Sequence, residues 1–280
     1  MKKSALYITL LILFVISLVS CKKEILTSIM AGDDPNFRIV ENDAGILKKF
    51  TRYVEVFGIK IFAVPEVADE KLLHAANVMA QYLDNDENGK VDNQKVLSSM
   101  IDHKAFMVMW KKEKDLRIVP PIGRIGQDLG DDETQPEFVR NGKTGRFDAS
   151  LEEVLHIITH AGYAKAYPDI FGEQMGSQLA KAMDLARGGQ FKRIPDSYPA
   201  DAWYTYDDQT CGYRCMATEY HYWALTSWLG AQENRLHEIQ EEWRLNTRAK
   251  LEAIDPAVVH LLTDPQYAFP TILPDGTYRH

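Results

Sequence analysis

The sequence lacks the short motifs by which many enzymes that use serine nucleophiles, nucleotides or dinucleotides are recognised. Its 280 residues contain no G-x-S-x-G elbow, no phosphate-binding loop and no dinucleotide-binding glycine pattern. Internal repeats and low-complexity tracts are absent as well. The sequence therefore does not indicate a serine hydrolase, a phosphate-loop nucleotide-binding protein or a dinucleotide-dependent enzyme.

Cysteine is scarce, since the chain has only Cys21, Cys211 and Cys215. The last two are spaced C-G-Y-R-C, and no second cysteine pair accompanies them to complete a tetrahedral zinc site. In an exported protein this spacing favours a short-loop disulfide between Cys211 and Cys215. Zinc binding by the pair is the weaker alternative.

The chain also has few long apolar runs, and its acidic residues outnumber its basic residues. Apart from residues 5–19, no segment is long and apolar enough to span a bilayer, although 45% of the residues are apolar and can form a core. The formal net charge is −8 and no basic stripe occurs, so we expect no nucleic-acid partner.

The amino-terminal residues have the pattern of a secretory signal. Residues 1–3 are Met-Lys-Lys, residues 5–19 are apolar, and residues 18–21 are Leu-Val-Ser-Cys. This pattern resembles the lipobox of bacterial lipoproteins, which implies removal of residues 1–20 and lipidation of Cys21. The resemblance predicts a cell-envelope protein, anchored to a bacterial membrane by its lipid and facing outside the cytoplasm. An uncleaved anchor and a secreted protein without lipid are the alternatives.

Hydrophobic periodicity predicts a mainly helical α+β fold with a small mixed sheet. Strands are expected at residues 52–64, with a bend at Gly58, at 105–110 and at 116–119. Helices are expected at 67–83, 93–103, 177–187, 215–230 and 233–254, with a further helix from Ser150. Residues 123–147 are rich in Gly, Asp and Asn, which predicts a long surface loop.

The predicted organisation has four parts. The signal peptide at residues 1–20 precedes a tether and entry segment at 21–50. A strand–helix region follows at 51–115, and a helical region at 116–280 packs with it as one compact unit. Residues 265–280 are expected to form an extended strap, because prolines and a glycine interrupt them.

A polar loop joins two of the predicted helices and carries oxygen ligands at alternate positions. It resembles an EF-hand-like calcium loop, in which a glycine makes a sharp turn. The resemblance implies calcium ligands from the side chains of Asp84, Asp86, Asn88 and Asp92 and from the backbone carbonyl of Lys90. Lys95 departs from the family, which has a bidentate acid there, so we expect weak or water-completed binding. A turn without an ion is the alternative.

Residues 152–160, E-E-V-L-H-I-I-T-H, place possible metal ligands on one helical face. Glu152, Glu153, His156 and His160 fall within about a quarter of the circumference of a regular helix. Histidines four residues apart on a helix are the spacing that zinc hydrolases use. A pair of hydrogen-bonded or surface histidines is the alternative.

A third ligand is expected from another element, and Glu219 lies on a predicted helix 59 residues after His160. The order of these segments resembles the gluzincin class of zinc peptidases, in which a helix with histidine ligands precedes a helix with a glutamate ligand. The resemblance implies zinc bound by His156, His160 and Glu219, with a peptide as substrate.

The usual general base of such peptidases is missing, because Ile157 occupies its position. Glu153 or Glu152 could act instead. However, Ser150 and Glu153 also match a helix capping box, which would make Glu153 structural. Glu152 could also be a fourth ligand, and that would make the zinc site structural rather than catalytic.

Aromatic residues crowd the region before Glu219, and most of them are expected to pack in the core. Tyr213 or Tyr206 could instead stabilise a developing oxyanion near the zinc. Two functions of different classes follow from the sequence. The protein is either an exported, lipid-anchored zinc peptidase or peptidase relative, or a non-enzymatic, calcium-binding lipoprotein of the cell surface.

Overall fold

The computed structural model describes residues 34–43, 47–117 and 123–280. The predicted signal peptide, the lipidation residue Cys21 and the first part of the tether lie outside these residues. Across the described ranges, no helix has both the length and the apolar character needed to cross a bilayer.

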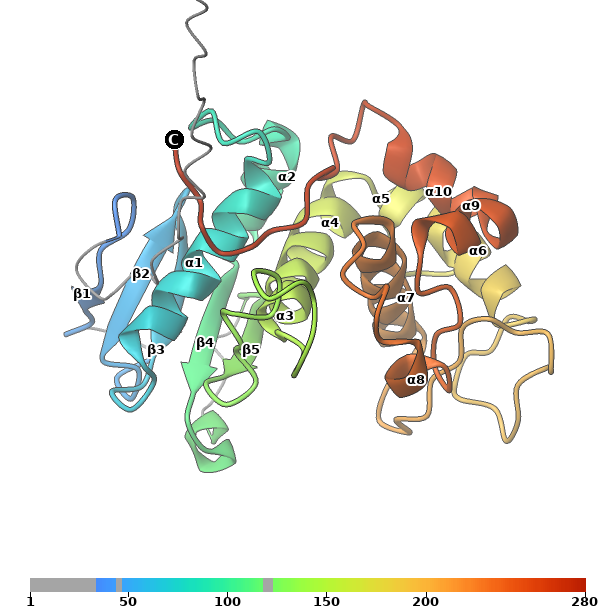
Figure 1. Cartoon of the computed structure of the whole chain (residues 1–280), viewed down its shortest axis with the longest axis horizontal. Helices are drawn as coiled ribbons and strands as arrows, with labels where there is room; N and C mark the ends of the chain where they lie inside the picture. The colour runs from blue at the N-terminus through green and yellow to red at the C-terminus, as the bar shows by residue number, and fades with distance from the viewer. Residues whose placement is uncertain (1–33, 44–46, 118–122) are drawn as a thin grey trace, which may run out of the picture.

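The fold is α+β and mainly helical, as predicted, with one mixed sheet at one side of the molecule and a group of helices at the other (Figure 1). The strands lie side by side in sequence order. The first three run antiparallel, whereas β3, β4 and β5 run parallel. The strands are β1 (Val40–Glu41), β2 (Arg52–Val56), β3 (Ile59–Ala63), β4 (Phe106–Trp110) and β5 (Gly126–Gly130).

The stretch at residues 52–64, expected to be two short strands or one bent strand, forms two strands, β2 and β3, joined as an antiparallel hairpin. Val56 pairs with Ile59, so the turn consists of Phe57 and Gly58, both of which have positive φ. The apolar run that predicted a strand at 105–110 forms β4, which is almost entirely buried in the middle of the sheet.

Strand β5 lies in the stretch predicted to be a loop, so that prediction was wrong for residues 126–130, whereas residues 131–147 form turns and irregular structure. Of the strand expected at residues 116–119, Leu116 instead ends a short 3₁₀ helix, Glu113–Leu116, and residues 118 and 119 lie outside the described residues. The sequence of β5, Gly-Gln-Asp-Leu-Gly, has little strand propensity. It is a strand because every residue pairs with β4.

Two helices cover one face of the sheet (Figure 1). Helix α1 (Asp69–Leu83) packs on β2 and β3, and α3 (Ser150–Ile157) packs on β4 and β5. Helix α2 (Gln94–Asp102) follows α1 after the polar loop. A π-helical turn, Ile158–Tyr163, continues α3 directly.

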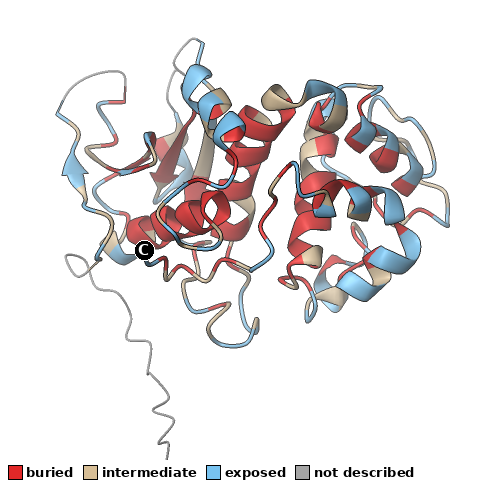
Figure 2. Ribbon diagram, turned by 90° about the horizontal axis from the view of Figure 1, so that it is seen from above, coloured by how far each residue is buried: buried red, intermediate tan, exposed pale blue. Residues whose placement is uncertain are grey.

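The other helices form a second group beside α3. Helix α7 (Tyr213–Trp228) contacts α3, and in Figure 2 the buried residues concentrate along the helices in the middle of the molecule. The remaining members are α4 (Ala164–Ala166), α5 (Pro168–Phe171), α6 (Gln178–Ala186), α8 (Leu236–Ile239), α9 (Arg248–Ile254) and α10 (Pro256–Thr263).

The single helix predicted at residues 233–254 is instead two short helices, α8 and α9. Between them Trp243 is fully buried and makes a β-bridge with Tyr204. Thr247 then caps the first turn of α9 by accepting a hydrogen bond from the Lys250 amide. The buried position of the Trp243 indole therefore favours an irregular segment here, although the apolar residues recur with helical spacing.

Residues 264–280 form the extended strap that the prolines predicted. The strap leaves α10 and returns across the molecule to the loop between α1 and α2 (Figure 1). The ring of Phe269 stacks on Tyr163 with centroids 4.1 Å apart, and the Tyr278 hydroxyl donates to Asp84. The strap thus connects the two groups of helices.

Candidate metal centre

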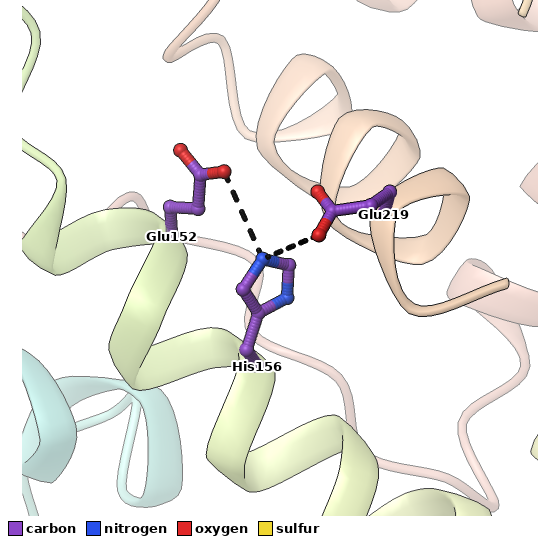
Figure 3. Close-up of side chains that lie close together, drawn as sticks. All are labelled: Glu152, His156 and Glu219. Carbon is purple, nitrogen blue, oxygen red and sulfur yellow. Dashed lines mark ion pairs between the residues drawn. The ribbon is translucent and has the colours of Figure 1, made fainter. Parts of the chain in front are cut away.

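Helices α3 and α7 bring three predicted site residues together (Figure 3). His156 Nε2 lies 3.4 Å from Glu219 Oε1 and 3.7 Å from Glu152 Oε1. One ligand atom from each of the three residues lies within 4.8 Å of the others, an arrangement that can hold a metal ion. Glu152 and His156 come from successive turns of α3, and Glu219 comes from α7.

The two separations from His156 are longer than those of short, charge-assisted hydrogen bonds. A histidine nitrogen and a carboxylate oxygen in a hydrogen bond lie about 2.7–2.9 Å apart. Two ligand atoms bound tetrahedrally to zinc, each at about 2.0–2.1 Å, lie about 3.4 Å apart. The distances from His156 to Glu219 and Glu152 are close to the second value.

The electrostatics of the group favour a cation. Burial alone would lower the pKa of His156, but the carboxylates of Glu219, Glu152 and Glu153 outweigh burial and raise this pKa well above its ordinary value. The side chain of His156 is 6% exposed, so water contributes little and nearby acids must stabilise a positive charge there.

Further acids surround the group, and Glu242 is one that sequence reasoning missed. Burial and the charges of Asp207, Glu219 and Glu152 raise the pKa of Glu242 to about 7. Burial and the charges of Glu219 and Glu242 also raise the pKa of Tyr206. Negative potential therefore extends beyond the three clustered residues. No spacing rule could have linked Glu242 to α3, because it belongs to the irregular segment between α8 and α9.

The predicted capping box at the start of α3 does not form. Ala149 is the N-cap residue, and the Ser150 hydroxyl donates to Asp148 instead of capping the helix. The carboxylate of Glu153 accepts a hydrogen bond from Gln127 on β5. Burial raises the pKa of Glu153 to about 8, against the opposing effect of His156. The structural role predicted for Glu153 was therefore wrong, and its role as a base stays a prediction.

His160 is not part of the group formed by Glu152, His156 and Glu219. The helix widens into the π-helical turn from Ile158, where hydrogen bonds span five residues, so the spacing of a regular α-helix no longer applies. His160 Nδ1 lies 2.7 Å from both carboxylate oxygens of Glu173. Glu173 was not predicted, because it lies in a short loop after α5 and matches no motif.

A cavity of about 600 Å³ connects these residues, which is a volume typical of ligand sites. His156 and Glu219 form one part of its wall, and His160 and Glu173 form another. The lining residues also include Gly126, Gln127, Gly212, Tyr213, Arg214, Cys215 and Thr218.

Tyr213 lines the cavity, but its hydroxyl donates to Asp184 at 2.9 Å and so is engaged outside the metal group. Of the two tyrosines predicted as oxyanion partners, Tyr206 is the one whose pKa responds to Glu219. The predicted disulfide is present: Cys211 and Cys215 are bridged, with Cα atoms 5.4 Å apart. The bridge fixes the start of α7, one turn before Glu219.

The loop between α1 and α2 forms a second group of acids. Carboxylate oxygens of Asp84, Asp86 and Asp92 lie within 4.8 Å of one another. Asp84 is fully buried and accepts hydrogen bonds from the amides of Asn88 and Gly89, which shapes the turn. Burial raises the pKa of Asp92, and the charges of Asp86 and Asp84 raise it further.

Lys95, which replaces the bidentate acid of the calcium-loop pattern, places its ammonium 4.1 Å from the ring centroid of Tyr167. Weak binding therefore remains the expectation for calcium. With a dissociation constant of about 1 mM, calcium at about 10 mM would add about 1.4 kcal/mol to the free energy of unfolding.

We expect Asp86→Ala to abolish this gain, as measured by thermal unfolding with and without calcium. Asp86 is exposed and bonds only within the loop, so the substitution leaves the buried Asp84 in place. The matched control is Asp102→Ala, an exposed acid in the last turn of α2. A calcium response that survives Asp86→Ala, or is absent from the unsubstituted protein, would count against the loop as a site.

Comparison with protein-family models, with curated proteins and with solved structures gives no match.

Proposed function

We propose that the protein is an exported, lipid-anchored zinc protein that hydrolyses peptide bonds in the cavity between α3 and α7. The observation that carries the proposal is the group of Glu152, His156 and Glu219, whose ligand atoms lie within 4.8 Å of one another, close enough to share one metal ion. The lipid anchor rests on the sequence around Cys21.

The donor set supports zinc, since one imidazole and two carboxylates are ligands that zinc accepts. Three protein ligands beside an open cavity are typical of catalytic zinc sites, whereas structural sites have four. When bound there, zinc would polarise the substrate carbonyl and activate water.

Metal analysis of the protein beginning at Lys22 tests the site. We expect about one zinc per chain, and an affinity that falls by more than about 100-fold in His156→Ala and in Glu219→Ala, because loss of a direct ligand costs more than loss of an outer-shell partner. The matched control is His237→Ala, whose side chain is 76% exposed. Zinc content that is unchanged in both site variants, or absent at the start, would contradict the proposal.

Hydrolysis needs a separate measurement. The zinc-loaded protein is expected to cleave members of a peptide library, and His156→Ala is expected to lose this activity. A zinc-loaded protein that cleaves none of the peptides would remove the enzymatic part of the proposal. The second candidate, a non-enzymatic calcium-binding protein of the cell surface, would then be preferred, because the Asp84–Asp92 loop supports it independently.

A further inference from the structure

We propose that His160 is the proton carrier of the reaction rather than a zinc ligand, and that Glu173 positions it. The inference rests on the proposed peptide hydrolysis and deepens it. It also supplies the base that Ile157 cannot provide.

The contact between His160 and Glu173 fixes the form of the imidazole. A carboxylate only accepts hydrogen bonds, so Nδ1 of His160 carries the proton that bonds to both oxygens of Glu173. The other nitrogen, Nε2, is then the basic one. Histidines that act as general bases are held in this way by a carboxylate.

Glu173 is itself held firmly. Its side chain is 5% exposed, the Thr218 hydroxyl donates to it at 2.9 Å, and the Arg214 guanidinium lies 3.6 Å away. Thr218 and Arg214 both belong to α7, the helix that carries Glu219. The same helix therefore orients the carboxylate behind His160 and supplies an acid to the metal group.

The two histidines of the motif differ in exposure. The side chain of His156 is 6% exposed, whereas that of His160 is 30% exposed, and both line the same cavity. A ligand can be fully enclosed, but a proton carrier must reach water and substrate. Within the part of the chain that the structure describes, the metal group includes His156 and omits His160.

The proposed step balances without any further reactant. Nε2 of His160 takes a proton from water while the water oxygen forms a bond to the carbonyl carbon, and the π electrons move to the carbonyl oxygen. Nε2 then gives this proton to the amide nitrogen as the C–N bond breaks. The products are a carboxylic acid and an amine, and Glu173 remains a carboxylate throughout.

Zinc content and peptide cleavage of His160→Ala and Glu173→Gln test the assignment. We expect both variants to keep about one zinc per chain. The kcat is expected to fall about 10²–10⁴-fold in His160→Ala and about 10–100-fold in Glu173→Gln, with little change in KM. Added imidazole should restore part of the activity of His160→Ala, and Glu173→Asp should keep more activity than Glu173→Gln.

Loss of zinc in His160→Ala would show that His160 is a ligand and would overturn the inference. Full activity in that variant would overturn it too. If either variant fails to fold, ¹¹³Cd NMR of the unsubstituted protein decides: coupling of cadmium to the imidazole of His156 alone supports the inference, and coupling to His160 refutes it. Failure of the unsubstituted protein to bind zinc or cleave peptides would instead count against the proposed function.

Discussion

Replacing Asp148 with asparagine is expected to lower the free energy of unfolding by about 3 kcal/mol, because buried donors would lose hydrogen bonds to a charged acceptor. Asp148 is 1% exposed, and its Oδ2 lies 2.7 Å from His74 Nε2 and 2.6 Å from the Ser150 hydroxyl. Its Oδ1 accepts from the amide of Gln135. An asparagine would place its NH₂ group against one set of these donors and would replace a charged acceptor with a neutral one.

The loss should depend on pH. Burial alone would raise the pKa of Asp148, but the charge of His74 and hydrogen bonds from His74, Ser150 and Gln135 outweigh it, so the pKa lies below its ordinary value. A carboxylate with a lowered pKa stabilises the fold fully above its unfolded pKa of about 3.9. This contribution disappears as pH falls through the folded pKa.

Urea unfolding of the unsubstituted protein and of Asp148→Asn, repeated from pH 7 to pH 3, measures both effects. The difference between the two should be constant near neutrality and should shrink in acid. The control is Asp132→Asn, whose side chain is 82% exposed and pairs with Arg146 at the surface; it should leave the midpoint unchanged. A difference below about 1 kcal/mol at pH 7 would show that the buried pair does not stabilise the fold.

Gly276→Ala is expected to cost about 3 kcal/mol, because backbone strain and a steric clash add together. Gly276 has φ of +77°, and a Cβ atom there would lie 2.0 Å from His74 Nδ1. The strap would have to move away from α1, which would also break the hydrogen bond from the Gly276 amide to Gln81.

Gly142→Ala separates the two contributions. Gly142 has nearly the same φ, +75°, but no atom of the described residues lies within 4 Å of the place that a Cβ atom would take. Thermal unfolding should therefore show a loss of only about 1 kcal/mol for this control. Equal losses in the two variants would mean that the strap does not pack tightly on His74.

Local sequence patterns predicted those parts of the fold in which side chains determine the backbone. The apolar run of β4 and the periodicity of α1, α6 and α7 are examples. The sequence patterns gave wrong predictions where contacts with residues far away in the sequence determine the secondary structure. Gly126, Gln127 and Asp128 have no strand preference and form β5 only because β4 lies beside them. Trp243 interrupts a helical pattern because its indole is buried against Tyr204.

The residues of the candidate site also fall into those that the sequence predicted and those that only the tertiary structure reveals. Helical spacing placed Glu152 and His156 on one face, and the order of helices suggested Glu219, which the structure places beside His156. Zinc binding by these residues stays a prediction. Glu173 and Glu242 come from irregular segments, so only tertiary packing could bring them to the cavity. The π-helical turn could not be foreseen either, because its residues are compatible with a regular helix.

The contacts of the strap can form only late in synthesis, because the strap is the last part of the chain to be made. Tyr278 bonds to Asp84, which lies 194 residues earlier, and the backbone of Thr271 and Ile272 bonds to Asn85. A ribosome that adds about 5–20 residues per second would need roughly 10–40 s between making the loop and making its partners. The loop that begins at Asp84 is therefore among the last parts of the amino-terminal half to reach its final set of contacts.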